Sequence, residues 1–194
     1  MQHWRSYLLG WLLEFFGRRE SALTAYRAAL RVKPDFHRCA NRLAYTLGLL
    51  DRYAEAEPYF LAVLQADPRN AAAHFNLGFT QDKRGQYAQA VVSFREATRL
   101  NPKLDRAWYG LGLAHARLGQ HLEAAQALEQ AALLQPMNPH AWYQLGMAHH
   151  VLRNPDRVKE VALHLVRFDP KMARRLIQDS GIEGLDYLIR DLVV

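Results

Sequence analysis

Cysteine is almost absent from this 194-residue chain, which carries Cys39 alone. A single thiol excludes an intrachain disulfide and a four-cysteine zinc site, and it fits a reducing compartment. We therefore predict that the protein is cytoplasmic.

Long apolar runs are missing as well. Residues 7–16, YLLGWLLEFF, are apolar but too few to span a bilayer. Glu14 interrupts this stretch, Arg18 and Arg19 follow it, and no small-residue cleavage pattern is present, so it does not resemble a signal peptide. We expect it to form the first helix of the fold and predict no transmembrane segment.

The short motifs that mark common enzyme classes are also missing. The chain has no Gly-rich phosphate loop, no GxSxG turn and no HExxH helix, and its carboxylates do not converge in sequence. His115 and His149 lie 34 residues apart with His150 beside the second, but no carboxylate or thiol recurs with them at ligand spacing. Packed histidines are therefore favoured over a metal site. We predict no enzyme activity, no metal and no cofactor.

The composition is that of a folded, basic protein. Half of the residues are hydrophobic and 23% are charged, which argues against disorder. The formal net charge of +6 favours an acidic partner. Basic residues are spread along the chain and often lie near Glu, as Arg95 and Arg99 lie near Glu96, so a solvated surface explains most of them. Binding of single-stranded nucleic acid is a weaker alternative.

A step of 34 residues organises the chain. Residues 71–102 predict two amphipathic helices, 71–84 and 86–100, separated by Gly85 and stopped by Asn101-Pro102. Such a hairpin has too little apolar surface to fold alone, so it needs copies on either side. Those copies are marked by prolines at every thirty-fourth residue: Pro34, Pro68, Pro102, Pro136 and Pro170.

The prolines define five units, which we number internally from 1 to 34: residues 3–36, 37–70, 71–104, 105–138 and 139–172. Position 7 is leucine in every unit, and position 8 is small, as expected where two helices approach closely. The position 8 residues are Gly10, Ala44, Gly78, Gly112 and Gly146. Position 20 is Ala or Val, and position 24 is aromatic in the first three units.

Local chemistry supports this register. Gly17, Gly85 and Gly119 lie at the turn between helices, where glycine adopts a positive φ at low cost. Asn138-Pro139 predicts a helix start with a capping side chain. Pro58 lies inside the second helix of its unit and should cost that helix one hydrogen bond.

A large residue at position 4, Leu at 7, Gly at 8, Ala at 20 and 27, an aromatic residue at 24 and Pro at 32 resemble the tetratricopeptide repeat (TPR) pattern over residues 3–170. The resemblance implies an all-α solenoid, a right-handed superhelix of antiparallel helix pairs. Residues 173–194 are expected to form C-terminal capping helices, with docking on another molecule as the alternative.

The resemblance also implies that the first helices line a concave groove through positions 2, 5, 6, 9, 12 and 13. These positions are aromatic along the array and basic in its middle, so we predict a scaffold or adaptor that binds an extended peptide or helix with acidic and apolar residues. The alternative is that the position 5 aromatic residues only pack against neighbours. The predicted groove residues are Arg38, Asn41, Arg42, Tyr45, Phe75, Asn76, Phe79, Lys83, Arg106, Tyr109, Arg117 and Tyr143.

Some TPR proteins bind a peptide C-terminal carboxylate with a set of Lys, Arg and Asn side chains. Only Asn76 and Arg106 fit that pattern, so the clamp is not predicted.

The first helix is apolar nearly all round. Self-association into a homo-oligomer and a hydrophobic partner segment are the favoured explanations, because Glu14 and the scarcity of lysine fit peripheral membrane contact poorly. The predicted self-association residues are Trp4, Tyr7, Trp11, Phe15, Leu188 and Leu192.

Overall fold

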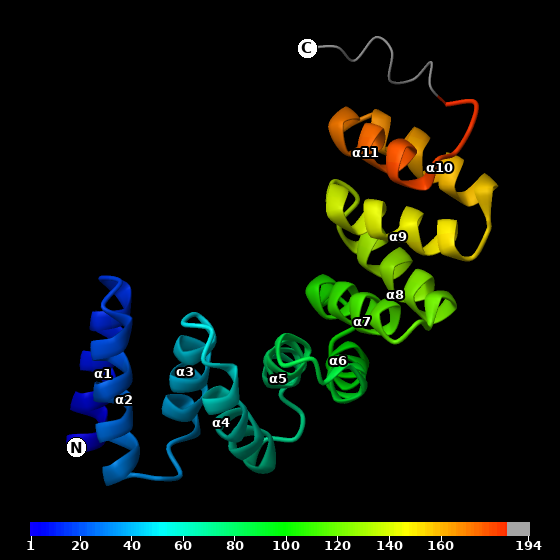
Figure 1. Cartoon of the computed structure of the whole chain (residues 1–194). Coiled ribbons are helices and arrows are strands. Elements are labelled where there is room, and N and C mark those ends of the chain that lie inside the picture. Colours follow the sequence, from blue (N-terminus) through cyan, green and yellow to red (C-terminus); the bar gives the residue numbers. More distant parts are fainter. Residues whose placement is uncertain (186–194) are drawn as a thin grey trace. The chain divides into compact units, whose positions relative to one another are not determined.

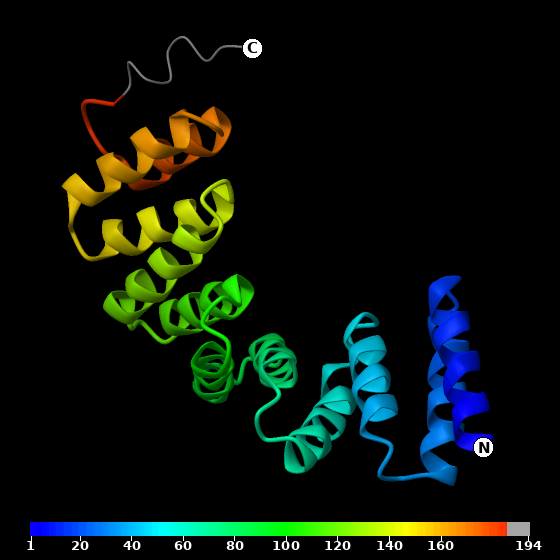
Figure 2. The ribbon, with the colours of Figure 1, turned by 180° about the vertical axis from the view of Figure 1, so that it is seen from behind.

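The computed structural model describes residues 1–185, and the chain is all-α in that range, as predicted (Figure 1). The helices pack two by two as hairpins, each closed by a short turn, which Figure 2 shows from behind. The helices of the described range are α1 (Gln2–Phe15), α2 (Arg19–Val32), α3 (His37–Gly48), α4 (Tyr53–Ala66), α5 (Ala71–Lys83), α6 (Tyr87–Leu100), α7 (Asp105–Arg117), α8 (His121–Leu134), α9 (Pro139–Val151), α10 (Pro155–Val166) and α11 (Pro170–Ser180).

The turns inside the hairpins share one backbone conformation. Gly17, Gly85 and Gly119 have φ of 73°, 75° and 74°, which confirms the prediction for these glycines. Asp51 and Arg153 occupy the same turn position in the second and fifth repeats, with φ of 57° and 56°. The turn therefore imposes the left-handed conformation even where the residue is not glycine.

Asparagine and aspartate side chains start several helices. Asn138 accepts a hydrogen bond from the His140 backbone N–H at 3.1 Å, as the sequence predicted. Asn70 does the same for α5, accepting from Ala73 N–H at 3.0 Å. Pro58 lies inside α4, which continues from Tyr53 to Ala66.

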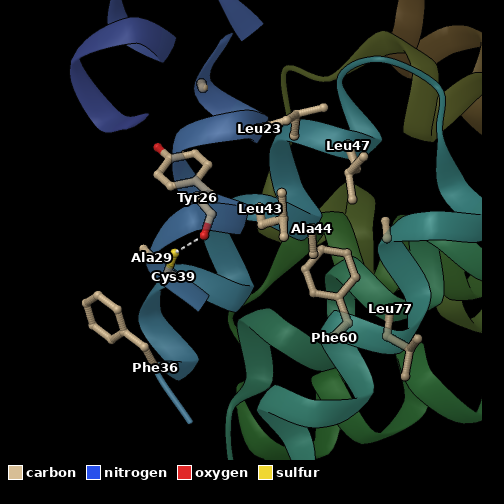
Figure 3. Packing of buried hydrophobic residues seen from close by; sticks show 12 residues of the cluster. Leu23, Tyr26, Ala29, Phe36, Cys39, Leu43, Ala44, Leu47, Phe60 and Leu77 are labelled. Atoms are coloured by element: carbon tan, nitrogen blue, oxygen red, sulfur yellow. Dashed lines mark hydrogen bonds between the residues drawn. The ribbon is translucent and has the colours of Figure 1, made fainter. Parts of the chain in front are cut away.

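The helices form two compact units, one of residues 1–101 and a second that begins at residue 102. The core of the first unit is a buried cluster that includes Tyr26, Leu43, Leu47 and Phe60 (Figure 3). The core of the second unit is built from residues of α8 to α11, including Leu128, Leu145, Leu165 and Leu176. Each unit thus buries the apolar faces of its own hairpins.

Small residues at position 8 allow the two helices of a hairpin to touch. A Cβ added to Gly112 would lie 2.6 Å from Leu128 Cγ, and one added to Gly10 would lie 2.6 Å from the Tyr26 ring. The fifth repeat differs. A Cβ added to Gly146 would lie 2.6 Å from Leu176 Cδ2 of α11, and not against the residue at position 24. A side chain from α11 therefore fills the space beside α9.

The helix α11 starts earlier than the 34-residue step implies. Pro170 is its first residue, whereas Pro34, Pro68 and Pro136 lie in loops after a second helix. Its buried residues are Ala173, Leu176, Ile177 and Ser180, and its outward residues are mostly charged or polar. Residues 186–194, the rest of the predicted cap, lie outside the described range.

Candidate binding surfaces

The first helix of each of repeats two to five has one buried side and one open side. The position 7 leucines Leu43, Leu77, Leu111 and Leu145 are buried. Residues at positions 2, 9 and 13 of the same helices are exposed or partly exposed. These exposed positions are among those that the repeat pattern assigns to the groove.

The first compact unit carries an aromatic and basic area on α3 and α5, which lie in contact. Tyr45 and Phe79 occupy position 9 of these helices and are 45% and 41% exposed. Arg38 and Lys83 are exposed on the same two helices, two turns and one turn away from these rings. We call Arg38, Tyr45, Phe79 and Lys83 the α3–α5 surface.

Phe79 is held in place from two sides. Its ring meets the Tyr53 ring edge-on with centroids 6.2 Å apart, and Lys83 Nζ lies 5.4 Å from its centroid. The Tyr53 hydroxyl in turn donates to Asp51 at 2.5 Å, which raises the pKa of Tyr53 to about 12. An exposed aromatic ring is thus fixed beside an ammonium group.

Arg42, predicted as a groove residue, is already paired. Its guanidinium lies 2.9 Å from the Glu14 carboxylate on α1, and the Tyr26 hydroxyl donates to the same carboxylate at 2.7 Å. Burial and this bond to Glu14 raise the pKa of Tyr26 well above its usual range. The sequence missed this network because its three residues come from α1, α2 and α3, and its charge is largely balanced.

The other predicted groove residues of the first compact unit, residues 1–101, are half-buried. Phe75 packs against Phe94 with ring centroids 5.9 Å apart, which fits the alternative that position 5 aromatic residues pack. Asn76 is half-buried on α5. Asn41 is half-buried too, and its Oδ1 meets no hydrogen-bond donor among the described residues. These three side chains therefore lie partly beneath the exposed residues of the open side.

Four predicted groove residues belong to the second compact unit, which begins at residue 102. Arg106 and Arg117 are exposed on α7, whereas Tyr109 is half-buried against the core, and burial raises its pKa. The Tyr143 hydroxyl donates to Asp179 of α11 at 2.6 Å, and Arg175 lies 5.0 Å from its ring centroid. That these four residues bind a partner stays a prediction.

The predicted self-association residues separate into two groups. Trp4, Trp11 and Phe15 are exposed on α1, but Tyr7 is half-buried against Tyr26 and Phe36. Leu188 and Leu192 lie outside the described residues.

Of the three histidines that the sequence analysis considered as metal ligands, His115 and His149 are packed, whereas His150 is exposed. His115 is buried with its Nδ1 2.6 Å from Gln120 Oε1. His149 is half-buried, and burial lowers its pKa. Within residues 1–185, no group of three or more His, Cys, Asp or Glu side chains is placed to hold a metal ion.

Surface hollows lie away from the predicted groove. One is lined by Leu30, His37 and Tyr59, another by Leu61, His74 and Val92, and a third by Arg153, Lys159 and Gly181. None of the three is lined by a predicted groove residue. No helix in the described part of the chain is long and apolar enough to cross a bilayer.

Four family models of the tetratricopeptide repeat match the chain. Three described as "Tetratricopeptide repeat" match residues 7–71, 59–92 and 105–138, and one described as "TPR repeat" matches residues 82–119. Together they cover residues 7–138 without a gap. A comparison with curated proteins finds no significant match.

Solved structures resemble the fold over most of the chain. YrrB, described as a TPR protein with an unusual peptide-binding site, is 21% identical with a TM-score of 0.79 over 89% of this chain and 90% of its own. A MamA segment from Desulfovibrio magneticus RS-1 is 22% identical with a TM-score of 0.78 over 92% and 96%. PilF of Pseudomonas aeruginosa is 18% identical with a TM-score of 0.75 over 98% and 88%. At these identities the likeness concerns the fold.

Proposed function

Because the chain belongs to the tetratricopeptide repeat family, we propose that it is a non-catalytic scaffold that binds a segment of another protein on the α3–α5 surface. The observation that carries this proposal is the exposure of Tyr45 and Phe79 at the same repeat position of neighbouring helices. YrrB, a fold relative, is described as having a peptide-binding site, which makes the proposal reasonable for this fold.

The two rings suit apolar recognition. Aromatic side chains bury a large area on binding while fixing few rotatable bonds, and they are enriched at binding hot spots. Contact with Tyr53 already limits the motion of Phe79, so little further order is needed when a partner arrives. A partner with apolar side chains spaced to reach both rings would cover them.

The charges beside the rings favour an acidic partner. Arg38 and Lys83 are exposed, whereas the Arg42 charge is balanced by Glu14. Acidic residues next to the apolar anchors would therefore meet two basic side chains of the α3–α5 surface.

Selection of peptides from a displayed random library on the purified chain tests the proposal. We expect enrichment of peptides that combine Asp or Glu with Leu, Phe or Trp. Their affinity, measured by calorimetry, should fall about tenfold or more in a Tyr45→Ser, Phe79→Ser variant. Because both side chains are exposed, this variant should keep the fold.

The matched control replaces exposed apolar residues on second helices. Leu61 and Val92 are 50% and 67% exposed on α4 and α6, so a Leu61→Ser, Val92→Ser variant removes similar apolar area elsewhere. It should bind the selected peptides as the wild type does. The Lys83→Glu variant should bind acidic peptides more weakly than the wild type, with the largest loss of affinity at low salt. Equal binding by the test and control variants, or no enrichment at all, would contradict the proposal.

A further inference from the structure

A second open surface covers α1. Phe15 is 73% exposed, and six other large apolar side chains of α1 and its C-cap are exposed with it. At about 100° per residue these side chains span an arc of about 160° of the helix. We call this set the α1 surface: Trp4, Leu8, Leu9, Trp11, Leu12, Phe15 and Phe16.

The acidic residue of this helix points away from that arc. Glu14 lies on the opposite side, its side chain only 9% exposed, held by Arg42 at 2.9 Å and by the Tyr26 hydroxyl at 2.7 Å. The sequence objection to membrane contact rested partly on Glu14. With that carboxylate turned inward, Glu14 no longer counts against membrane contact, and the basic residues of the exposed surface are arginines rather than lysines.

The exposed charges on α1 and directly after it are positive. Arg5 lies within the arc, and Arg18 and Arg19 are exposed directly after the helix. Glu20, the next acidic residue, lies 3.2 Å from Arg52 and is paired there. A broad apolar arc containing two tryptophans and bordered by arginines is the pattern of a helix that lies in the interface of an anionic bilayer.

We propose that the α1 surface binds the surface of an anionic lipid bilayer, with α1 lying in the plane of the interface. The seven side chains would enter the boundary between headgroups and acyl chains. Trp4 and Trp11 suit that depth, because indole has an apolar body and a polar N–H. Arg5, Arg18 and Arg19 would meet lipid phosphates.

Geometry favours lipid over a second copy of the chain. The 14-residue helix α1 is about 21 Å long and about 10 Å wide. Pairing two such helices covers a strip of each, well short of the ~800 Å² per partner that stable protein pairs bury. A fluid lipid surface can follow a curved arc of about 160°, which one straight helix cannot.

Flotation with phospholipid vesicles tests this inference on the full chain. We expect binding to vesicles that contain phosphatidylglycerol and little binding to phosphatidylcholine alone. A Trp11→Ser, Phe15→Ser variant should bind about tenfold or more weakly. Replacing Arg18 and Arg19 by glutamine should weaken vesicle binding about fivefold for each residue. Each arginine near an anionic surface strengthens binding by about that factor.

A control variant and a second measurement separate the possible results. Leu61→Ser, Val92→Ser should float like the wild type, and Trp fluorescence should shift to shorter wavelength only with anionic vesicles. No flotation at low salt would overturn the inference, and so would unchanged flotation of the Trp11→Ser, Phe15→Ser variant. Light scattering that shows a dimer lost in that variant, without vesicle binding, would assign the surface to a second copy instead.

The lipid inference stands apart from the proposed peptide binding. It uses residues of α1, whereas the peptide proposal uses Tyr45, Phe79 and Lys83 of α3 and α5. A variant at one surface should leave binding at the other unchanged, so either proposal can fail alone.

Discussion

Replacing Glu14 with glutamine removes the charge that holds three helices of the first unit together. In the native chain this carboxylate lies 2.9 Å from Arg42 on α3 and accepts from the Tyr26 hydroxyl on α2 at 2.7 Å. Glutamine keeps the size of the side chain and one oxygen acceptor. The substitution therefore isolates the electrostatic part of the contact.

The expected loss in free energy of unfolding lies between two limits. An exposed ion pair contributes at most about 1 kcal/mol, whereas breaking a fully buried one costs about 3–5 kcal/mol. Glu14 is nearly buried, but Arg42 is 34% exposed, so water can solvate part of the stranded guanidinium. The bond from Tyr26 weakens by about 1 kcal/mol when its acceptor becomes neutral. We expect Glu14→Gln to lower the free energy of unfolding by about 2 kcal/mol.

Urea unfolding followed by circular dichroism measures this difference. A Glu14→Gln, Arg42→Met double variant should lose no more stability than Glu14→Gln alone, because no stranded charge remains. Glu96→Gln is the control, since Glu96 forms an ion pair with Arg99 on the exposed face of α6 and should show no measurable change. Equal effects at Glu14 and Glu96 would refute the view that the first pair is a structural link.

Three further predictions concern packing, reactivity and pH. Gly112→Ala should destabilise by about 1–2 kcal/mol despite its better helix propensity, because the new Cβ would lie 2.6 Å from Leu128, whereas Gly48→Ala meets nothing within 4 Å and should cost nothing. Burial raises the pKa of the Cys39 thiol to about 12, so a disulfide reagent at neutral pH should label it about 100-fold faster in urea than in buffer. Burial, aided by the Arg157 charge, lowers the pKa of His149, so the unfolded chain binds this proton more readily. Unfolding free energy should therefore fall as pH drops below about 6.5, and less so in His149→Gln.

Local patterns explain how much of the fold could be predicted from the sequence. Helix periodicity, the turn glycine Gly85 and the proline step each act within one unit, so they placed α5 and α6 within a residue or so. Pro170 shows the limit of this reasoning. It keeps the step but begins α11, because α10 ends at Val166 after 12 residues rather than the 14 of α8.

Contacts between repeats decide which predicted groove residues are exposed and which are paired. The repeat register gave Arg38 and Arg42 the same expected role, and only the structure separates the exposed Arg38 from the paired Arg42. The same holds for Tyr143, whose partner Asp179 lies 36 residues away on α11. Single-sequence patterns carry no information on such pairs, because the partner comes from another repeat.

Amide chemical-shift mapping with one acidic, apolar peptide selected on the chain tests the peptide-binding proposal most directly. We expect the shifted resonances to cluster on α3 and α5 around Tyr45, Phe79 and Lys83. Shifts that cluster around Leu61 and Val92 on α4 and α6, or that spread evenly over the chain, would contradict the proposal.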